Sequence, residues 1–151
     1  MMRLYLDLCC FNRPYDDQTQ VRIRLETEAI IVLQEKVKQA ECHLIWSSTL
    51  DFENANNPYP AQRLAIQQWR NLACVVVMAD PAVIAKAHEW AAVGVGRYDA
   101  LHLASAIAGG ADLFVTTDDR ILKKISSSQE LRVTPPLAAL ALLESWYDHG
   151  N

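Results

Sequence analysis

The sequence predicts an α/β fold, a three-layer α/β/α domain with a central parallel sheet of about five strands. Short apolar runs alternate with longer stretches of helical periodicity, which is typical of parallel strands joined by helices that cover both faces of the sheet. Acidic residues follow several of the apolar runs, where strands end or helices begin. The 151 residues contain no internal repeat and no long linker, so we expect one domain spanning residues 1–151.

The strands are predicted from short apolar segments bounded by polar residues or turns. The run 3–6, Arg-Leu-Tyr-Leu, is closed by Asp7 and is typical of a buried strand. The continuous apolar run 73–78 predicts a strand that is buried on both faces. The complete set of predicted strands is 3–6, 43–46, 73–78, 113–116 and 131–133.

The helices are predicted from apolar residues at helical spacing and from capping signals. Thr19 is placed to cap a long helix that reaches about Ala40. Ser47 or Ser48 is placed to cap the helix that carries Glu53. The remaining predicted helices span about 61–71, 81–92, 97–108, a segment opened by residue 118, and 135–146, while residues 12–17 form a polar connection.

The composition is that of an ordinary globular protein. Hydrophobic residues make up 51% of the chain and charged residues 21%, which argues against intrinsic disorder. No apolar run approaches the ~20 residues of a membrane helix, and the first segment lacks the pattern of a signal peptide, so we expect a cytoplasmic protein without a membrane partner. A net charge of −4 argues against binding nucleic acid by bulk electrostatics, but bound divalent cations would offset it.

The four cysteines follow no common metal-binding spacing. Cys9 and Cys10 are adjacent, and Cys42 and Cys74 lie beside predicted strands. No CxxC motif occurs in the chain. We therefore expect buried free thiols that behave as small apolar residues.

Four carboxylates occur at element boundaries: Asp7, Glu53, Asp99 and Asp118. Asp7 ends the first strand and Asp118 follows the strand 113–116. In open α/β sheets, ligands bind outside the carboxyl ends of the strands, near the point where strand order reverses, so these acids can meet at one edge. Each acid also has a simpler explanation as a turn, capping or solvated residue. The pattern alone leaves a metal site as one hypothesis among several.

Two segments near the C-terminal half carry a family signature. Residues 98–106 read Tyr-Asp-Ala-Leu-His-Leu-Ala-Ser-Ala, and residues 110–119 read Gly-Ala-Asp-Leu-Phe-Val-Thr-Thr-Asp-Asp. Together they resemble the C-terminal signature of PIN-domain nucleases. The strand 4–7 resembles the first PIN strand with its leading aspartate, and the segment 47–53 resembles the entry to the helix that bears the PIN glutamate. The resemblance implies a PIN-like (Rossmann-like) fold over nearly the whole chain.

The sequence departs from the family pattern at two places. Many members follow the first aspartate with Thr or Ser, whereas residues 8–10 here read Leu-Cys-Cys, so support for Asp7 must come from elsewhere. Residues 54–60 also differ from the apolar continuation that is common after the PIN glutamate. These differences bear on the choice of substrate more than on the metal site, because all four acids are present.

The resemblance implies a metal-dependent endoribonuclease that uses Mg²⁺ or Mn²⁺. It assigns Asp7, Asp99 and Asp118 as the main metal ligands or outer-sphere anchors. Glu53 would hold a second ion or orient the attacking water. We expect four further residues to support the carboxylates of the site: Thr116, Asp119, His102 and Asn12.

The resemblance also suggests partners. A compact chain of this kind is similar to VapC-type toxins of toxin–antitoxin pairs, which implies an RNA substrate, a cognate antitoxin protein and a homodimer. Apolar residues of the segments 21–37 and 64–69 exceed the needs of one core, which fits a homodimer. Two other classes stay open: a non-catalytic PIN-like module that binds RNA or protein, and a thiol-regulated protein that uses Cys9 and Cys10.

Overall fold

The structure is a computed structural model that describes residues 1–125 and 128–147. Within these residues, five parallel strands form one sheet in the order β3-β2-β1-β4-β5. The strands are β1 Arg3–Leu6, β2 His43–Ser47, β3 Ala73–Val77, β4 Leu113–Val115 and β5 Val133–Thr134. The α-helices are α1 Leu8–Asn12, α2 Val21–Lys38, α3 Ser48–Asn54, α4 Pro60–Gln67, α5 Pro81–Ala92, α6 Arg97–Ala108, α7 Asp119–Ile125 and α8 Pro136–Leu143. Short 3-10 helices are η1 Arg13–Tyr15 and η2 Gln68–Leu72.

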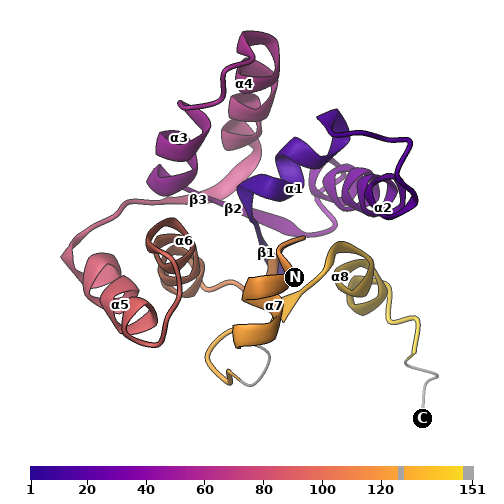
Figure 1. Cartoon of the computed structure of the whole chain (residues 1–151). Coiled ribbons are helices and arrows are strands. Elements are labelled where there is room, and N and C mark those ends of the chain that lie inside the picture. Colours follow the sequence, from indigo (N-terminus) through magenta and orange to yellow (C-terminus); the bar gives the residue numbers. More distant parts are fainter. Residues whose placement is uncertain (126–127, 148–151) are drawn as a thin grey trace.

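Helices cover both faces of the sheet (Figure 1). On one face α6 packs against β2 and β3, and α5 packs against α6. On the other face α8 contacts β4, and α2 contacts α8. The predicted three-layer α/β/α fold with a central parallel sheet is therefore confirmed.

Strand β1 lies at the centre of the sheet, between β2 and β4. Both of its faces are covered, and Leu4, Tyr5 and Leu6 are fully buried. The ring of Tyr5 stacks on Phe114 of β4 with 5.3 Å between the ring centroids. Strand β1 is therefore held in the core on both of its faces.

The strand order reverses between β1 and β4. After β1 the chain adds β2 and β3 on one side, then returns to add β4 on the other. The register pairs Leu6 with Val115, so Asp7 and Thr116 leave the sheet side by side. The backbone N–H of Asp7 donates to the carbonyl of Val115 at 2.9 Å. This edge is where parallel α/β sheets bind ligands.

The turn after β1 differs from its prediction. Residues 12–17 were predicted to form a polar connection. Helix α1 ends within this stretch, at Asn12, and η1 occupies Arg13–Tyr15. The carboxylate of Asp7 caps α1, and α1 buries Leu8, Cys10 and Phe11. A helix of five residues is too short to show helical periodicity in the sequence.

Several helix ends also differ. Gln20, and not Thr19, occupies the cap position of α2, because the Thr19 hydroxyl donates to Asp17 at 2.6 Å. The predicted helix 61–71 is α4 followed by the tighter η2, and α8 ends at Leu143, before the predicted end at Trp146. Local hydrogen bonds and turns determine where these helices begin and end, and the spacing of apolar residues in the sequence does not show them.

Strand β3 is not buried on both faces, contrary to its prediction. It lies at the edge of the sheet, where Cys74 is exposed and the other residues are half-buried. The prediction of four buried thiols is wrong for Cys74 for the same reason, and Cys9 is only half-buried. An apolar run does not distinguish a central strand from an edge strand. Strand β5 is also displaced toward the C-terminus relative to the predicted 131–133.

Helix α2 carries apolar side chains on more than one face. Leu33 is fully buried, whereas Val21, Leu25, Ile31 and Val32 are exposed. One protein core does not account for the exposed set. Among the described residues, no helix combines the length and apolar character needed to cross a membrane.

Candidate active site

Asp7 is the only buried acid among the described residues, with 6% of its surface exposed. Its Oδ1 accepts from the backbone N–H of Leu8 at 2.8 Å, and its Oδ2 accepts from the Thr116 hydroxyl at 2.9 Å. The Cys9 thiol lies 3.5 Å from the same Oδ2. Burial raises the pKa of Asp7, and the neighbouring His102 and these hydrogen bonds offset only part of the rise.

Thr116 supplies the support that the turn after Asp7 lacks. Its buried hydroxyl donates to Asp7 and accepts from the backbone N–H of Asp118 at 3.1 Å. Cys9 Sγ lies 3.4 Å from this hydroxyl and accepts from the backbone N–H of Thr117 at 3.4 Å. The partner of the first aspartate therefore comes from the loop after β4 and from a thiol in its own turn.

A chain of hydrogen bonds connects Glu53 to the interior. Glu53 Oε1 lies 3.2 Å from His102 Nε2, and His102 Nδ1 lies 2.5 Å from the hydroxyl of Tyr5. The Tyr5 hydroxyl lies 2.7 Å from Ser47 Oγ, which also accepts from the backbone N–H of Leu50 at 3.1 Å. The chain joins α3, α6, β1 and the end of β2.

The donors along this chain have a consistent direction. An ionised Glu53 only accepts, so His102 Nε2 donates to it, and a neutral His102 then accepts from Tyr5 at Nδ1. Tyr5 in turn accepts from the hydroxyl of Ser47. Burial raises the pKa of Tyr5 well above its usual range, so the phenol keeps its proton. Burial alone would lower the pKa of His102, but the Glu53 hydrogen bond and the surrounding carboxylates raise it overall.

Asp99 stands in the first turn of α6 and is half-buried. Burial raises its pKa to about 6, and the charges of Asp7, Asp118 and Glu53 add to the shift while His102 opposes it. The acids are therefore close enough to affect one another's titration. The start of α6, the ends of β1 and β4, and helix α3 each place a carboxylate at the carboxyl ends of the strands.

Asp118 is the acid whose charge is already compensated. Its Oδ1 accepts from the backbone N–H of Arg120 at 2.9 Å, and the Arg120 guanidinium lies 3.3 Å from its Oδ2. Partial burial would raise the pKa of Asp118, but these contacts lower it overall. Arg120 is 85% exposed, so the ion pair costs little to separate when a cation or phosphate approaches.

Two of the predicted supporting residues, Asp119 and Asn12, do not contact the four carboxylates. Asp119 forms a two-point ion pair with Arg22 of α2 at 2.9 and 2.8 Å, which fastens α7 to α2. Asn12 makes no hydrogen bond to the acids and lines a groove next to Glu53. Thr116 and His102 are the supporting residues that contact the predicted acids directly.

Among the described residues, one group of side chains with the spacing to hold a cation lies at Asp7. One ligand atom from each of Asp7, Glu53 and His102 lies within 4.8 Å of the other two. Two oxygens on opposite sides of Mg²⁺ are roughly 4 Å apart, so the two carboxylates need only small movements to share an ion. Asp99 and Asp118, predicted as ligands with Asp7, lie outside this closest group. His102 Nε2 already donates to Glu53, which suits an orienting role better than metal ligation.

A family model of the PIN domain matches residues 11–127. The chain belongs to the PIN domain family. The matched segment begins after Asp7, so the evidence for that residue is the register of β1 and β4 and the contacts described above. No curated protein matches this PIN domain significantly in sequence.

Solved structures are similar to this PIN domain in fold. FitAcB from Neisseria gonorrhoeae matches with a TM-score of 0.59 and 13% identity, covering 89% of this chain and 98% of that chain. VapBC2 from Rickettsia felis, bound to a DNA fragment from their promoter, matches with a TM-score of 0.54 and 14% identity over the same shares. At these identities the likeness supports the PIN fold and nothing finer.

The sequence did not predict Tyr5 and Ser47 as residues of the site, and it predicted Cys9 only as part of a thiol-regulated protein. Ser47 was recognised only as a helix cap, and its hydroxyl does accept from Leu50 in that role. Tyr5 was recognised only as part of a buried strand. A tyrosine in the middle of an otherwise aliphatic strand is the available signal, because a buried phenol needs a hydrogen-bond partner.

We expect Tyr5→Phe to destabilise the protein by about 1–3 kcal/mol, because it leaves His102 Nδ1 and the Ser47 hydroxyl without their buried partner. Chemical denaturation measures this change. Tyr147→Phe, which removes the same hydroxyl from a side chain that is 83% exposed, serves as the control and should leave the free energy of unfolding unchanged. Equal stability of the two variants would contradict a stabilising role for the buried hydrogen bonds of the Tyr5 hydroxyl.

Proposed function

We propose that this PIN domain is a divalent-metal-dependent endoribonuclease that hydrolyses RNA phosphodiester bonds. The observation that carries the proposal is the meeting of Asp7 and Glu53, with Asp99 and Asp118 beside them, at the edge where strand order reverses. Incubation of the purified protein with defined RNAs and Mg²⁺ or Mn²⁺ tests it. No cleavage, together with no Mn²⁺ binding by calorimetry, would instead indicate a non-catalytic PIN-like binding module.

Each carboxylate of the site has a separate role in the proposed reaction. Asp7, Asp99 and Asp118 would hold or anchor the cation, directly or through water, with Thr116 fixing the orientation of Asp7. Glu53, oriented by His102, would accept a hydrogen bond from the attacking water. When bound, Mg²⁺ or Mn²⁺ lowers the pKa of a coordinated water and offsets charge on the phosphate.

The thiol-regulated alternative has less support. Burial raises the pKa of Cys10 well above its usual range, which disfavours the reactive thiolate. Cys9 contacts Asp7 and Thr116 and so belongs to the support of the acid cluster. The four cysteines are free thiols in the structure.

The acid cluster makes metal binding depend on pH. Asp99 has a pKa of about 6 in the folded, metal-free protein against an ordinary value of 3.8. The stability that its protonated form contributes is present below 3.8 and is lost as the pH rises to about 6. A cation offsets the repulsion that remains, so we expect Mn²⁺ to raise the melting temperature more at about pH 7.5 than at about pH 5.

Differential scanning fluorimetry at the two pH values measures this effect. The Asp99→Asn variant cannot take up the proton, so its metal-free melting temperature should vary less over the same interval. An equal rise in melting temperature at both pH values would contradict the assignment of Asp99 to the metal site.

A toxin role is the biological setting that we propose for this activity. The resemblance of the chain to VapC-type toxins, and the similarity in fold to VapBC2, support it. We propose a cytoplasmic protein that is held inactive by a cognate antitoxin protein. Induced expression should arrest growth, and a neighbouring gene for a small antitoxin should relieve the arrest. Continued growth with active protein present would remove this role but would leave the nuclease assignment standing.

A homodimer is the assembly that we propose. The exposed apolar residues of α2, with Leu64 of α4, offer the surface for it. Sedimentation at several concentrations tests the proposal. A monomer at all concentrations would contradict it.

A further inference from the structure

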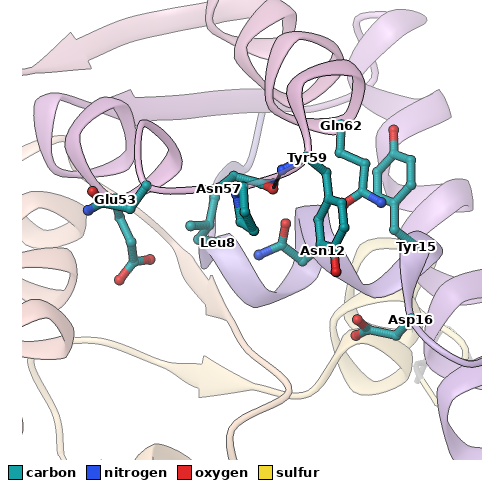
Figure 2. A pocket seen from close by; sticks show the side chains of 10 residues that line it. Leu8, Asn12, Tyr15, Asp16, Glu53, Asn57, Tyr59 and Gln62 are labelled. Atoms are coloured by element: carbon teal, nitrogen blue, oxygen red, sulfur yellow. Dashed lines mark hydrogen bonds between the residues drawn. The ribbon is translucent and has the colours of Figure 1, made fainter.

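A polar groove opens directly beside the candidate active site. It has a volume of about 650 Å³ and is lined by residues of α1, η1, α3, α4 and the turn between α3 and α4. The lining residues that matter here are Asn12, Tyr15, Glu53, Asn57, Tyr59 and Gln62. Figure 2 shows Glu53 at one end, the two tyrosines toward the other end, and the Asn12 amide between them. The groove therefore begins at a proposed catalytic carboxylate.

The lining offers flat rings and hydrogen-bonding amides. Tyr15 and Tyr59 are 47% and 61% exposed, so their rings are available to a ligand. Among the described residues, the side chains of Asn12, Tyr15, Tyr59 and Gln62 have no hydrogen-bond partner. Each amide presents both donors and an acceptor. A ligand with a planar ring and mixed donors and acceptors would match this surface.

The charges of the lining residues disfavour the phosphate groups of a ligand. Within residues 1–125 and 128–147, no lysine or arginine lines the groove, while Glu53 and Asp16 do. The guanidinium of Arg13 is engaged with Asp16 at 3.1 Å and with Glu26 at 3.3 Å, and that of Arg63 donates to the backbone carbonyl of Asn57 at 2.8 Å. A phosphate would be repelled here, so the fitting part of a polynucleotide is its uncharged base.

The groove is held in shape before a ligand arrives. Buried Asn54 donates to the Arg63 carbonyl at 3.0 Å and to Gln67 Oε1 at 3.1 Å, which ties α3 to α4. Arg63 in turn donates to the Asn57 carbonyl at 2.8 Å, and Asn57 Oδ1 accepts from the Tyr59 N–H at 3.0 Å. The segment 54–60, which departs from the family pattern, is thus the rigid wall of the groove. Preorganisation of this kind lowers the entropic cost of binding.

We propose that this groove binds an unpaired nucleobase of single-stranded RNA, next to the phosphate that the acid cluster cleaves. The inference rests on the proposed nuclease function and names the substrate feature that the enzyme selects. The base stacks on Tyr59, and Asn12 and Gln62 hydrogen-bond to its edge. Unstacked bases of this kind are presented by single-stranded loops and ends, so double-stranded RNA is a poor substrate.

Cleavage kinetics on a short single-stranded RNA, with the cut mapped first on the wild-type protein, test the proposal. Tyr59→Ala should raise KM by about 10-fold, because base–aromatic stacking contributes that much affinity. Tyr59→Phe keeps the ring and should retain wild-type KM. Tyr147→Ala, which removes an exposed tyrosine at the C-terminal end of the described chain, is the matched control and should also retain it.

A second substrate separates stacking from a general loss of the fold. RNAs that carry one abasic nucleotide, placed in turn at each position beside the cut, should include one that raises the wild-type KM by about as much as Tyr59→Ala does. The variant should be insensitive to that same abasic site. Additive effects of the variant and the abasic site would overturn the proposal.

The outcomes distinguish this inference from the proposed function. If the wild-type protein cleaves no RNA, the nuclease assignment fails and the groove loses its substrate with it. If the wild-type protein cleaves RNA and Tyr59→Ala leaves KM unchanged, only the nucleobase site fails. If Tyr59→Ala also leaves RNA cleavage unchanged but alters the sedimentation coefficient, the groove is a protein contact and the proposal is overturned.

Discussion

Asp99→Asn is expected to lower RNA cleavage by at least about 100-fold, because a correctly held divalent cation contributes several kcal/mol of transition-state stabilisation. The fold should persist. Asp99 is half-buried at the start of α6, and its pKa of about 6 shows that its charge is disfavoured in the metal-free protein. Removing that charge relieves repulsion with Asp7 and Asp118. The metal-free variant should therefore melt at or above the wild-type temperature near pH 7.5.

The control for this variant is Asp112→Asn. Asp112 lies before β4, at the opposite edge of the sheet from the acid cluster, and its carboxylate accepts from the backbone N–H of Arg3 at 2.7 Å. An amide oxygen can replace that acceptor, so cleavage should be unchanged. Both proteins are purified side by side to exclude contaminating ribonuclease. Wild-type cleavage by Asp99→Asn would remove Asp99 from the active site.

Chain order was sufficient to predict which edge of the sheet carries the acids. Asp7 and Asp118 follow strands that a parallel α/β fold brings to one edge, and the observed pairing of β1 with β4 puts them at the reversal of strand order. This part was predictable because topology depends on the pattern of apolar and polar residues over the whole chain. The individual roles of the acids remain predictions.

Side-chain partners were not predictable in the same way. Asp118 and Asp119 are adjacent and chemically identical, yet Asp118 faces Arg120 beside the cluster and Asp119 pairs with Arg22 of α2. Only the position of Arg22 on α2, within hydrogen-bond distance of Asp119 at the start of α7, separates them. Likewise α1 was missed, because its stability comes from the Asp7 cap and the burial of Phe11, and not from a visible period.

The departure from the family pattern after Asp7 has a structural explanation. Residues 8–10 provide no hydroxyl, and the Thr116 hydroxyl, delivered by the neighbouring strand, lies 2.9 Å from the carboxylate. A threonine at the end of a strand is equally consistent with a packing role and with a hydrogen-bonding role. The register of β1 against β4 decides between them.

Thr116→Val is the substitution that tests this support most directly. Valine has nearly the same shape as threonine, so the buried site stays filled, but the hydroxyl that donates to Asp7 and accepts from the Asp118 N–H is lost. We expect the free energy of unfolding to fall by about 1–3 kcal/mol, because the buried Asp7 carboxylate loses a donor and the partly buried Asp118 N–H loses its acceptor. We also expect Mn²⁺ affinity and cleavage to fall by about 10- to 100-fold, the usual cost of removing a partner that orients a metal ligand.

Thr116→Ser keeps the hydroxyl and loses only a methyl group, so it separates the two roles of the residue. It should retain Mn²⁺ affinity, measured by calorimetry, and cleavage within a few-fold of wild type, while losing about 1 kcal/mol of stability from the missing methyl group. If Thr116→Val and Thr116→Ser bind Mn²⁺ equally well, Thr116 only fills space. If Val alone weakens Mn²⁺ binding, the hydroxyl orients Asp7, and the aspartate that lies outside the matched family segment is part of the metal site.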